Sequence, residues 1–119
     1  MSGMRVTRAA EAPAYNAPLH RGVSTWRLQG HEAGPTERFW VGLSHYEPGG
    51  GADEAPTQEE TVYVMLAGEL TVTSGGERAT LGRHDSVHLL RGQVRGIHNH
   101  TSAPAVLLVI IAHRTEAGR

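Results

Sequence analysis

The amino-acid sequence predicts an all-β domain, either a small β-sandwich or a jelly roll. Its 119 residues include 15 Gly and 6 Pro, a density typical of short strands joined by tight turns and unfavourable for long helices. From Gly22 onward the apolar residues follow strand-like patterns. Continuous apolar stretches such as residues 106–111 indicate strands that are buried on both faces, as between two packed sheets.

The expected elements follow an N-terminal arm. Residues 1–20 have no apolar period, so we expect a flexible arm, disordered or laid over a partner, that contributes no chemistry. The barrel domain is expected over residues 21–115, with a short tail at 116–119. Eight strands are expected in it, at residues 23–28, 37–46, 61–66, 69–73, 77–81, 86–90, 93–100 and 105–114.

Turn-forming residues separate these expected strands. The breaks are the Pro48–Gly51 run, Gly68, the Gly75–Gly76 pair, Gly92 and Pro104. Glycine supplies a positive φ and proline a fixed φ, which are the requirements of tight turns. We therefore expect a series of hairpins, with the glycine run after Pro48 as a bend between two strands.

Composition excludes several classes of function. The chain has 11 Arg, no Lys and 12 acidic residues, for a formal net charge of −1 without a cluster of one sign, so we expect no nucleic-acid or membrane partner. The absence of Cys excludes thiolate nucleophiles and zinc–thiolate sites. The longest apolar run, residues 103–112, is too short to cross a bilayer, and no secretory signal is visible. A single domain with one site, in the cytoplasm, is expected.

Two segments resemble the motifs of a known family, the cupins. Residues 46–70, with Pro48-Gly49-Gly50 near the start and Gly68 near the end, resemble the first cupin motif, and residues 81–99 resemble the second. The hairpin between them and the closing apolar strand agree with this order. The chain is identified as a small bacterial-type single-domain cupin, and the resemblance implies an antiparallel jelly-roll β-barrel. Because small open barrels bury their exposed sheet edges against a symmetry mate, we also expect a homodimer.

The metal ligands of cupins are missing at the matching positions. The resemblance implies two His and one Glu in the first motif, but the positions counted back from Gly68 hold Ala55, Thr57 and Thr61, or Glu54, Pro56 and Glu60 with a bulged spacing. Both registers remain open. The second motif has Arg95 where its His is expected, and a guanidinium has no lone pair for a metal. We therefore expect no metal and no cofactor.

Arg95 is the centre of the candidate site. Strand alternation places Arg95, Ile97 and Asn99 on one face, which the resemblance turns toward the barrel interior. An interior guanidinium is costly unless it is paired, and the acid nearest the equivalent metal position is Glu60. We therefore expect a Glu60–Arg95 ion pair that replaces the metal and binds an anionic or carbonyl compound. The alternatives are a purely structural ion pair and an Arg95 that reaches solvent.

These residues predict a pocket for a small oxygenated or anionic molecule, with a metal-independent isomerase, cyclase or lyase activity. Arg95 would stabilise an enolate with the assistance of Asn99 or a Tyr hydroxyl, while Glu60 or His88 moves a proton. The predicted catalytic residues are Arg95, Glu60, His88 and Tyr63, and the predicted substrate-binding residues are Asn99, Thr61, Tyr46, Met65 and Trp40.

Two other functions remain open at this point. The chain could be a non-catalytic ligand-binding or sensory module. It could also be a metal-dependent cupin such as a dioxygenase, because it contains eight His that could form a non-standard ligand set from His45, His88, His98 and His100. If Arg95 faces inward, strand alternation turns His98 and His100 outward.

Overall fold

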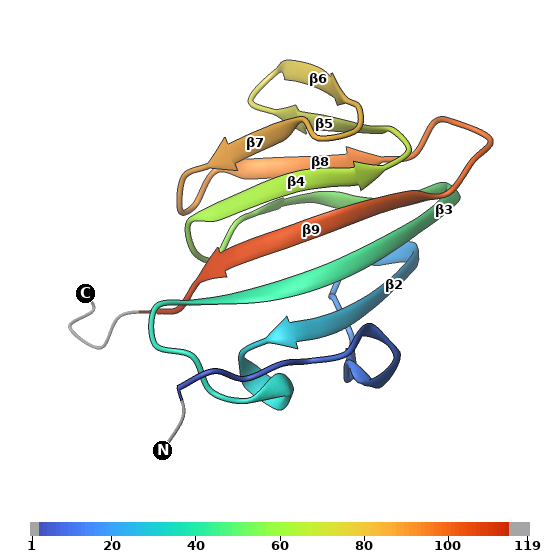
Figure 1. Ribbon diagram of the computed structural model, residues 1–119. Helices are drawn as coiled ribbons and strands as arrows, with labels where there is room; N and C mark the ends of the chain where they lie inside the picture. Colours follow the sequence, from blue (N-terminus) through green and yellow to red (C-terminus); the bar gives the residue numbers. More distant parts are fainter. Residues whose placement is uncertain (1–2, 115–119) are drawn as a thin grey trace.

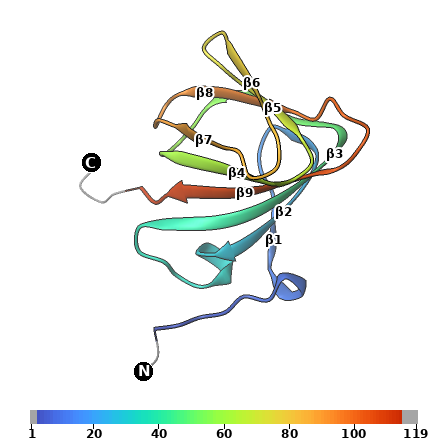
Figure 2. The ribbon, with the colours of Figure 1, turned by 45° about the horizontal axis from the view of Figure 1, so that its top comes forward.

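The computed structural model describes residues 3–114, and in them nine strands form one antiparallel sheet that curls into a nearly closed barrel (Figures 1 and 2). The strand order is β6-β5-β8-β3-β9-β4-β7, with β2 paired to β3 and β1 paired to β2. The strands are β1 (Ala14–Tyr15), β2 (His20–Gln29), β3 (Phe39–Pro56), β4 (Thr61–Ala67), β5 (Leu70–Ser74), β6 (Glu77–Leu81), β7 (Ser86–Leu89), β8 (Val94–His98) and β9 (Ala105–Ala112).

The prediction of an all-β jelly roll is confirmed. Helical structure among the described residues is limited to two short 3₁₀ helices, η1 (Ala9–Glu11) and η2 (His31–Ala33). No helix in residues 3–114 has the length and apolar character needed to span a membrane. Each of the eight expected strands has a counterpart, and most boundaries shift by three residues or fewer, with β2 beginning three residues early, at His20. The end of β3 differs more, because this strand was expected to end at residue 46 and runs to Pro56, and the short strand β1 was not expected.

The long strand β3 joins the two halves of the barrel. Its first half pairs with β9, for example Tyr46 with Ala105, and its second half pairs with β8, for example Ala52 with Ile97. The glycine run was expected to interrupt the strand, but the strand continues through it. A Cβ on Gly50 would lie 2.5 Å from the carbonyl oxygen of Gly22, so glycine here permits a close approach of two backbones.

The core follows the period-two pattern of the strands. In β4 the buried residues Thr61, Tyr63 and Met65 alternate with the partly exposed Val62 and Val64, so one face of the strand lines the interior. The buried apolar side chains come from most of the strands around the barrel: Tyr46, Ala52, Tyr63, Met65, Leu70, Val72, Leu81, Leu89, Ile97, Ala105, Leu107 and Val109.

The N-terminal arm lies along the barrel of its own chain. In the short strand β1, Tyr15 pairs with Thr25 of β2, and the amide of Arg27 donates to the carbonyl oxygen of Pro13 at 2.8 Å. The guanidinium carbon of Arg27 stands 3.7 Å from the centre of the Tyr15 ring. These contacts bring the arm to the open end of the barrel interior, where the candidate site lies.

Candidate functional site

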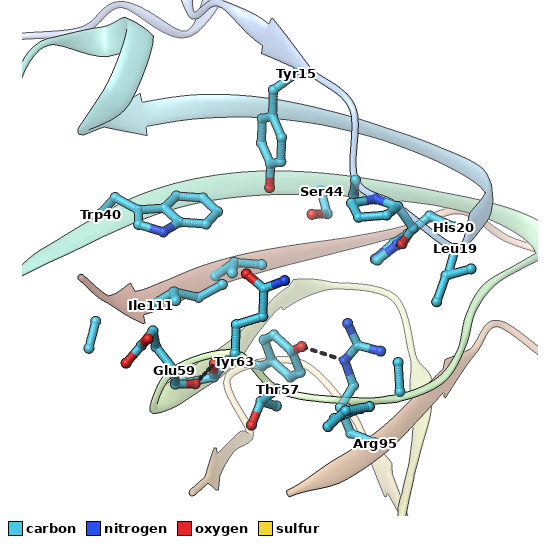
Figure 3. Close-up of a pocket in the computed structure, with 18 of the residues that line it drawn as sticks. Tyr15, Leu19, His20, Trp40, Ser44, Thr57, Glu59, Tyr63, Arg95 and Ile111 are labelled. Atoms are coloured by element: carbon cyan, nitrogen blue, oxygen red, sulfur yellow. Dashed lines mark hydrogen bonds between the residues drawn. The ribbon is translucent and has the colours of Figure 1, made fainter. Parts of the chain in front are cut away.

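A cavity of about 470 Å³ occupies the barrel interior between β2 and β3 on one side and β4 and β8 on the other (Figure 3). This volume is within the range of small-molecule sites. Its apolar lining includes Trp40, Val109 and Ile111. Its polar and charged lining comes from six elements or loops and includes Tyr15, His20, Ser44, Gln58, Glu59, Tyr63 and Arg95.

Arg95 and Tyr63 form the hydrogen-bonded pair at one end of this cavity. The Nε–H of Arg95 donates to the Tyr63 hydroxyl oxygen at 2.9 Å, and Nη1 donates to the carbonyl oxygen of Asp53 at 3.2 Å. The register of β3 against β8 shifts between Ala52 and Ala55. Such a bulge reorients the residues within it, and the carboxylate of Asp53 bonds Arg21 instead of Arg95.

Glu59 places a carboxylate at the other side of Tyr63 (Figure 3). Its side chain is 16% exposed, and one carboxylate oxygen lies 3.6 Å from Nε of Arg114. The Thr61 hydroxyl donates to the backbone carbonyl of Glu59 at 2.9 Å, which fixes the chain just before β4. The cavity therefore combines a carboxylate, a phenol and a guanidinium, which suits acid–base chemistry.

Aromatic rings form the wall opposite Tyr63. The Tyr15 and Trp40 rings meet edge to face with their centres 5.6 Å apart, and Figure 3 shows the Tyr15 hydroxyl pointing into the cavity. Arg27 stacks on both rings and bonds Glu32 at 2.9 Å. The arm, which was expected to contribute no chemistry, reaches the candidate site, because Tyr15, together with Ala17, Pro18 and Leu19, lines the cavity.

Burial determines the protonation of several groups in this wall. It lowers the pKa of His20, an effect to which the nearby charge of Arg95 adds and which the hydrogen bond from Nδ1 to the Pro18 carbonyl, at 2.7 Å, opposes. Burial also raises the pKa of both Tyr15 and Tyr46. At neutral pH the site thus presents a neutral imidazole and protonated phenols that donate hydrogen bonds.

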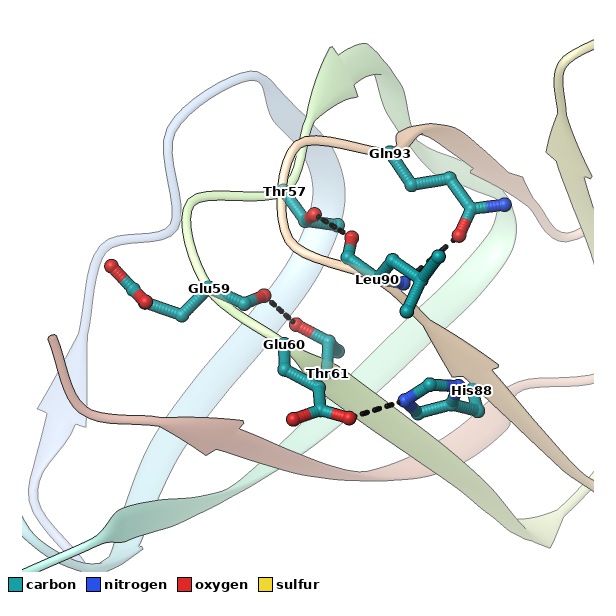
Figure 4. A network of polar contacts seen from close by, with 7 residues as sticks. All are labelled: Thr57, Glu59, Glu60, Thr61, His88, Leu90 and Gln93. Atoms are coloured by element: carbon teal, nitrogen blue, oxygen red, sulfur yellow. Dashed lines mark hydrogen bonds and ion pairs between the residues drawn. The ribbon is translucent and has the colours of Figure 1, made fainter. Parts of the chain in front are cut away.

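The predicted Glu60–Arg95 ion pair is wrong. Glu60 lies on the outside of the barrel, where its carboxylate is 2.6 Å from Nε2 of His88 and the two side chains are 61% and 50% exposed (Figure 4). The reason is strand alternation, because Thr61 faces inward and its neighbour Glu60 therefore faces outward. Glu60 and His88 are absent from the lining of the cavity.

The other predicted residues divide between the cavity and the surrounding core. Arg95, Tyr63, Thr61, Tyr46 and Trp40 line the cavity. Met65 is fully buried in the core, outside this lining. Asn99 faces inward as expected, but its amide bonds Tyr46, Thr101 and Ala103. Asn99 therefore organises a loop and does not contact the cavity.

The polar lining residues that sequence reasoning missed include Glu59, Tyr15, His20 and Ser44. Two of them carried a usable signal. Glu59 has the same parity as Thr61 and Tyr63, and Ser44 has the same parity as Tyr46, so alternation places each on the inner face. Tyr15 and His20 lie in or beside the arm, where no periodic pattern indicated which side chains face the barrel interior.

The residues at the family's metal-ligand positions do not fit a metal ion. Ala55, Thr57 and Thr61 line the cavity with Arg95, whereas Glu54 reaches the Thr73 hydroxyl on the other side, so the first of the two registers applies. The hydroxyl of Thr57 donates to the Leu90 carbonyl at 2.7 Å (Figure 4). This set contains no imidazole or carboxylate and includes a cation, which disfavours a divalent ion.

A non-standard His set is not assembled either. His98 and His100 stack with ring centres 4.5 Å apart, while His45 contacts Trp26 and His88 bonds Glu60. Within residues 3–114, no group of three or more His, Asp or Glu side chains is close enough to hold a metal ion. Within the described residues, these His residues therefore do not form the non-standard ligand set.

Comparison with known proteins gives a family match and a fold match. Residues 42–111 match the model of the cupin domain. A protein of Mycobacterium tuberculosis (strain ATCC 25618 / H37Rv) named beta-D-galactosidase Rv1717 is 63% identical over 110 residues, which cover 92% of this chain and 95% of that protein.

Two solved structures share the fold at low sequence identity. The polyketide cyclase RemF from Streptomyces resistomycificus superimposes with a TM-score of 0.80 at 16% identity, covering 92% of this chain and 79% of that one. An RmlC-like cupin from Shewanella frigidimarina superimposes with a TM-score of 0.76 at 13% identity, covering 97% and 96% of the two chains. Together with the two motifs and the barrel, these matches show that the chain belongs to the cupin domain family.

Proposed function

We propose that this cupin binds and hydrolyses β-D-galactosides in the cavity that Tyr63, Arg95 and Glu59 line. The observation that carries the proposal is the 63% identity, over 92% of the chain, to a protein named as a β-D-galactosidase. The cavity supports it, because about 470 Å³ accommodates a sugar ring. The aromatic wall of Tyr15 and Trp40 suits the apolar face of a sugar, and the surrounding hydroxyl and amide groups suit its hydroxyls.

Hydrolysis of a glycoside needs one group that activates water and one that protonates the leaving oxygen. Glu59 is the carboxylate among the described lining residues, so we assign it as the base. Its carboxylate takes a proton from water as the water oxygen bonds the anomeric carbon and the glycosidic bond breaks. Tyr63 donates its phenolic proton to the departing oxygen.

Arg95 makes Tyr63 suitable as the proton donor. The guanidinium donates to the Tyr63 oxygen at 2.9 Å, so the hydroxyl hydrogen of Tyr63 is free to bond another acceptor. Once Tyr63 has released its proton, the adjacent cation stabilises the phenolate. The water proton on Glu59 and the phenolate return to their starting forms by exchange with solvent, which closes the cycle.

The proposed reaction uses no metal, because the family's ligand positions hold Ala55, Thr57, Thr61 and Arg95. The isomerase, cyclase and lyase activities expected from the sequence would use similar acid–base chemistry, but the named relative favours hydrolysis. A non-catalytic binding role is the outcome to be distinguished by assay. The cytoplasmic location stays a prediction from sequence.

A pair of adjacent glutamates provides the test of the proposal. We expect the full chain to hydrolyse an alkyl β-D-galactoside, and Glu59→Gln to lower kcat by about 100-fold or more, the size of a general-base contribution. Glu60→Gln is the matched control, since it removes a carboxylate one residue away that lies outside the cavity. A wild-type protein that binds galactose without cleaving any galactoside would make the chain a binding module. Equal activity of the two variants would remove Glu59 from the mechanism.

We also propose that the chain is a homodimer that buries the outer face of β3, β9 and β4. Leu43, Leu108 and Val64 lie opposite one another across these strands, and all three are partly exposed. The outward-facing residues are every second residue of the ranges 41–45, 62–66 and 106–110. They are apolar except for one His, and none of them is Arg, Asp or Glu. An uncharged apolar face of this kind is rarely left open in a monomer and has no charge to oppose a second copy of itself.

A further inference from the structure

Arg95 places a guanidinium in the cavity without a carboxylate partner. Both of its described hydrogen bonds go to neutral acceptors, the Tyr63 hydroxyl and the Asp53 carbonyl. The ion pairs found within residues 3–114 do not include Arg95; they join Arg21 to Asp53, Arg27 to Glu32, His88 to Glu60 and Arg114 to Glu59.

The fold directs the nearby acids away from Arg95. On β3, the carboxylate of Asp53 bonds Arg21, and that of Glu54 accepts from the hydroxyl of Thr73. Neither acid lines the cavity. Glu59 does line it, but its carboxylate is next to Arg114, on the other side of Tyr63 from Arg95 (Figure 3). The cavity thus keeps a cation at one end whose charge the described chain leaves uncompensated.

The geometry of Arg95 suits a carboxylate. A guanidinium has five N–H donors in a planar fork, and the two hydrogen bonds to Tyr63 and Asp53 use one on Nε and one on Nη1. The three that remain are on Nη1 and Nη2, and two of them can bond a carboxylate side by side. Because Arg95 is half-buried in a cavity with an apolar wall, its electrostatic attraction for an anion is stronger there than it would be in water.

We infer that this site prefers an acidic sugar, a galactose-type ring that carries a carboxylate, which Arg95 anchors. The inference rests on the proposed function, and it names the substrate class for the same cavity. At the other end of the cavity the charges of Glu59 and Arg114 compensate each other, so the acid group is directed to the uncompensated charge of Arg95. The sugar is thereby oriented with respect to Tyr63, which lies between the two.

The test compares three ligands of nearly the same shape with the full chain, by isothermal titration calorimetry: D-galacturonate, its methyl ester and D-galactose. We expect D-galacturonate to bind about 10- to 100-fold more tightly than the ester, the effect of one charge-assisted hydrogen-bonded pair. Arg95→Met should bring the acid and the ester to similar affinity. Arg83→Met, which removes an exposed guanidinium in the turn before β7, should keep the preference.

The inference is overturned if the wild type does not bind D-galacturonate, if it binds acid and ester equally, or if the preference survives in Arg95→Met. Should Arg95→Met fail to fold, the wild-type comparison of acid with ester decides alone, because the ester differs only in charge and one methyl group. Hydrolysis of a neutral β-D-galactoside without an acid preference overturns the inference and leaves the proposed function standing. An Arg95-dependent preference for the acid without hydrolysis of any galactoside overturns the proposed function and leaves the inference standing.

Discussion

Asn99 holds together the loop between β8 and β9 by satisfying four polar partners at once. Its amide nitrogen donates to the carbonyls of Tyr46 and Ala103 at 3.1 and 2.9 Å, and its oxygen accepts from the amide and hydroxyl of Thr101 at 2.9 and 2.8 Å. The side chain is 1% exposed. Buried polar groups that lose such a partner are costly because water does not replace it.

Asn99→Ala should lower the free energy of unfolding by on the order of 3 kcal/mol, since several buried partners lose their bond together. Urea denaturation measures the loss. Ser102→Ala, at an exposed position in the same loop, is the control and should change stability little. Near-native stability of Asn99→Ala would contradict the structural role and would reopen the predicted contact with substrate.

His20 should make stability depend on pH. In the folded protein burial holds its pKa below the ordinary value of 6.5, whereas the unfolded chain titrates near 6.5. The neutral His20 therefore makes its full contribution to the free energy of unfolding above pH 6.5. As the pH falls below this value the unfolded state takes up a proton that the folded state does not, and stability declines down to the folded pKa.

Thermal unfolding of the wild type and His20→Gln between about pH 5 and 7.5 tests this titration. The melting temperature of the wild type should fall more steeply below pH 6.5 than that of the variant. The exposed His100 provides the control, because His100→Gln should follow the wild type. Parallel curves for all three proteins would show that His20 does not titrate differently in the two states.

Strand alternation explains which residues of the site could be predicted. Arg95, Tyr63 and Thr61 were assigned correctly to the interior because the motif and the period of two agree at these positions. The choice of Glu60 followed proximity to a family position, and the parity of the strand gives Glu59 instead. The inner face of a strand is thus readable from sequence, whereas ion-pair partners depend on contacts between strands.

At the scale of elements, the position of the N-terminal arm on the barrel depends on the stacking of Arg27 with aromatic rings. The guanidinium carbon of Arg27 lies over the rings of both Tyr15 and Trp40, 3.7 and 4.4 Å from the two ring centres. The Thr25 hydroxyl also bonds the backbone carbonyl of Tyr15. The sequence of the arm has no apolar period and gave no signal for this contact. The two aromatic side chains and the guanidinium meet only in the folded barrel.

Removal of residues 1–18 should leave the barrel folded and open one wall of the cavity. The core residues all lie after this segment, so the circular dichroism should remain that of a β protein. Binding of D-galactose should weaken by about tenfold or more, because an aromatic wall is lost. The tryptophan fluorescence, which comes from Trp26 and Trp40, should become more accessible to acrylamide. Unchanged galactose affinity would show that the arm is not part of the site.

The strands themselves were predictable because their apolar pattern and turn residues agree. The exceptions are β1, which lies in the expected arm, and β3, where Pro48 and three glycines indicated a bend. The strand continues because the glycines there permit close contact with β2 and β8. A glycine run in sequence does not distinguish a turn from a strand that passes close to two neighbours.

At the scale of the whole molecule, we expect the wild type to be a dimer and the Leu108→Arg variant to be a monomer. A two-fold interface would bring both copies of the new charge into the apolar face, and burial of unpaired charge is unfavourable. Sedimentation equilibrium should give twice the chain mass for the wild type and for Thr80→Arg, an exposed position on β6, but the single mass for Leu108→Arg. A monomeric wild type at tens of micromolar would refute the dimer.

The central claim, metal-free hydrolysis with Tyr63 as proton donor, is tested most directly by the leaving-group dependence of Tyr63→Phe. In the measurement, kcat is compared for an alkyl and a nitrophenyl β-D-galactoside in excess chelator. Tyr63→Phe should lose about 100-fold or more on the alkyl substrate, whose oxygen needs a proton to depart, and far less on the nitrophenyl substrate, whose phenolate leaves unaided. Equal losses on both substrates, or a wild type that the chelator inactivates, would contradict the account.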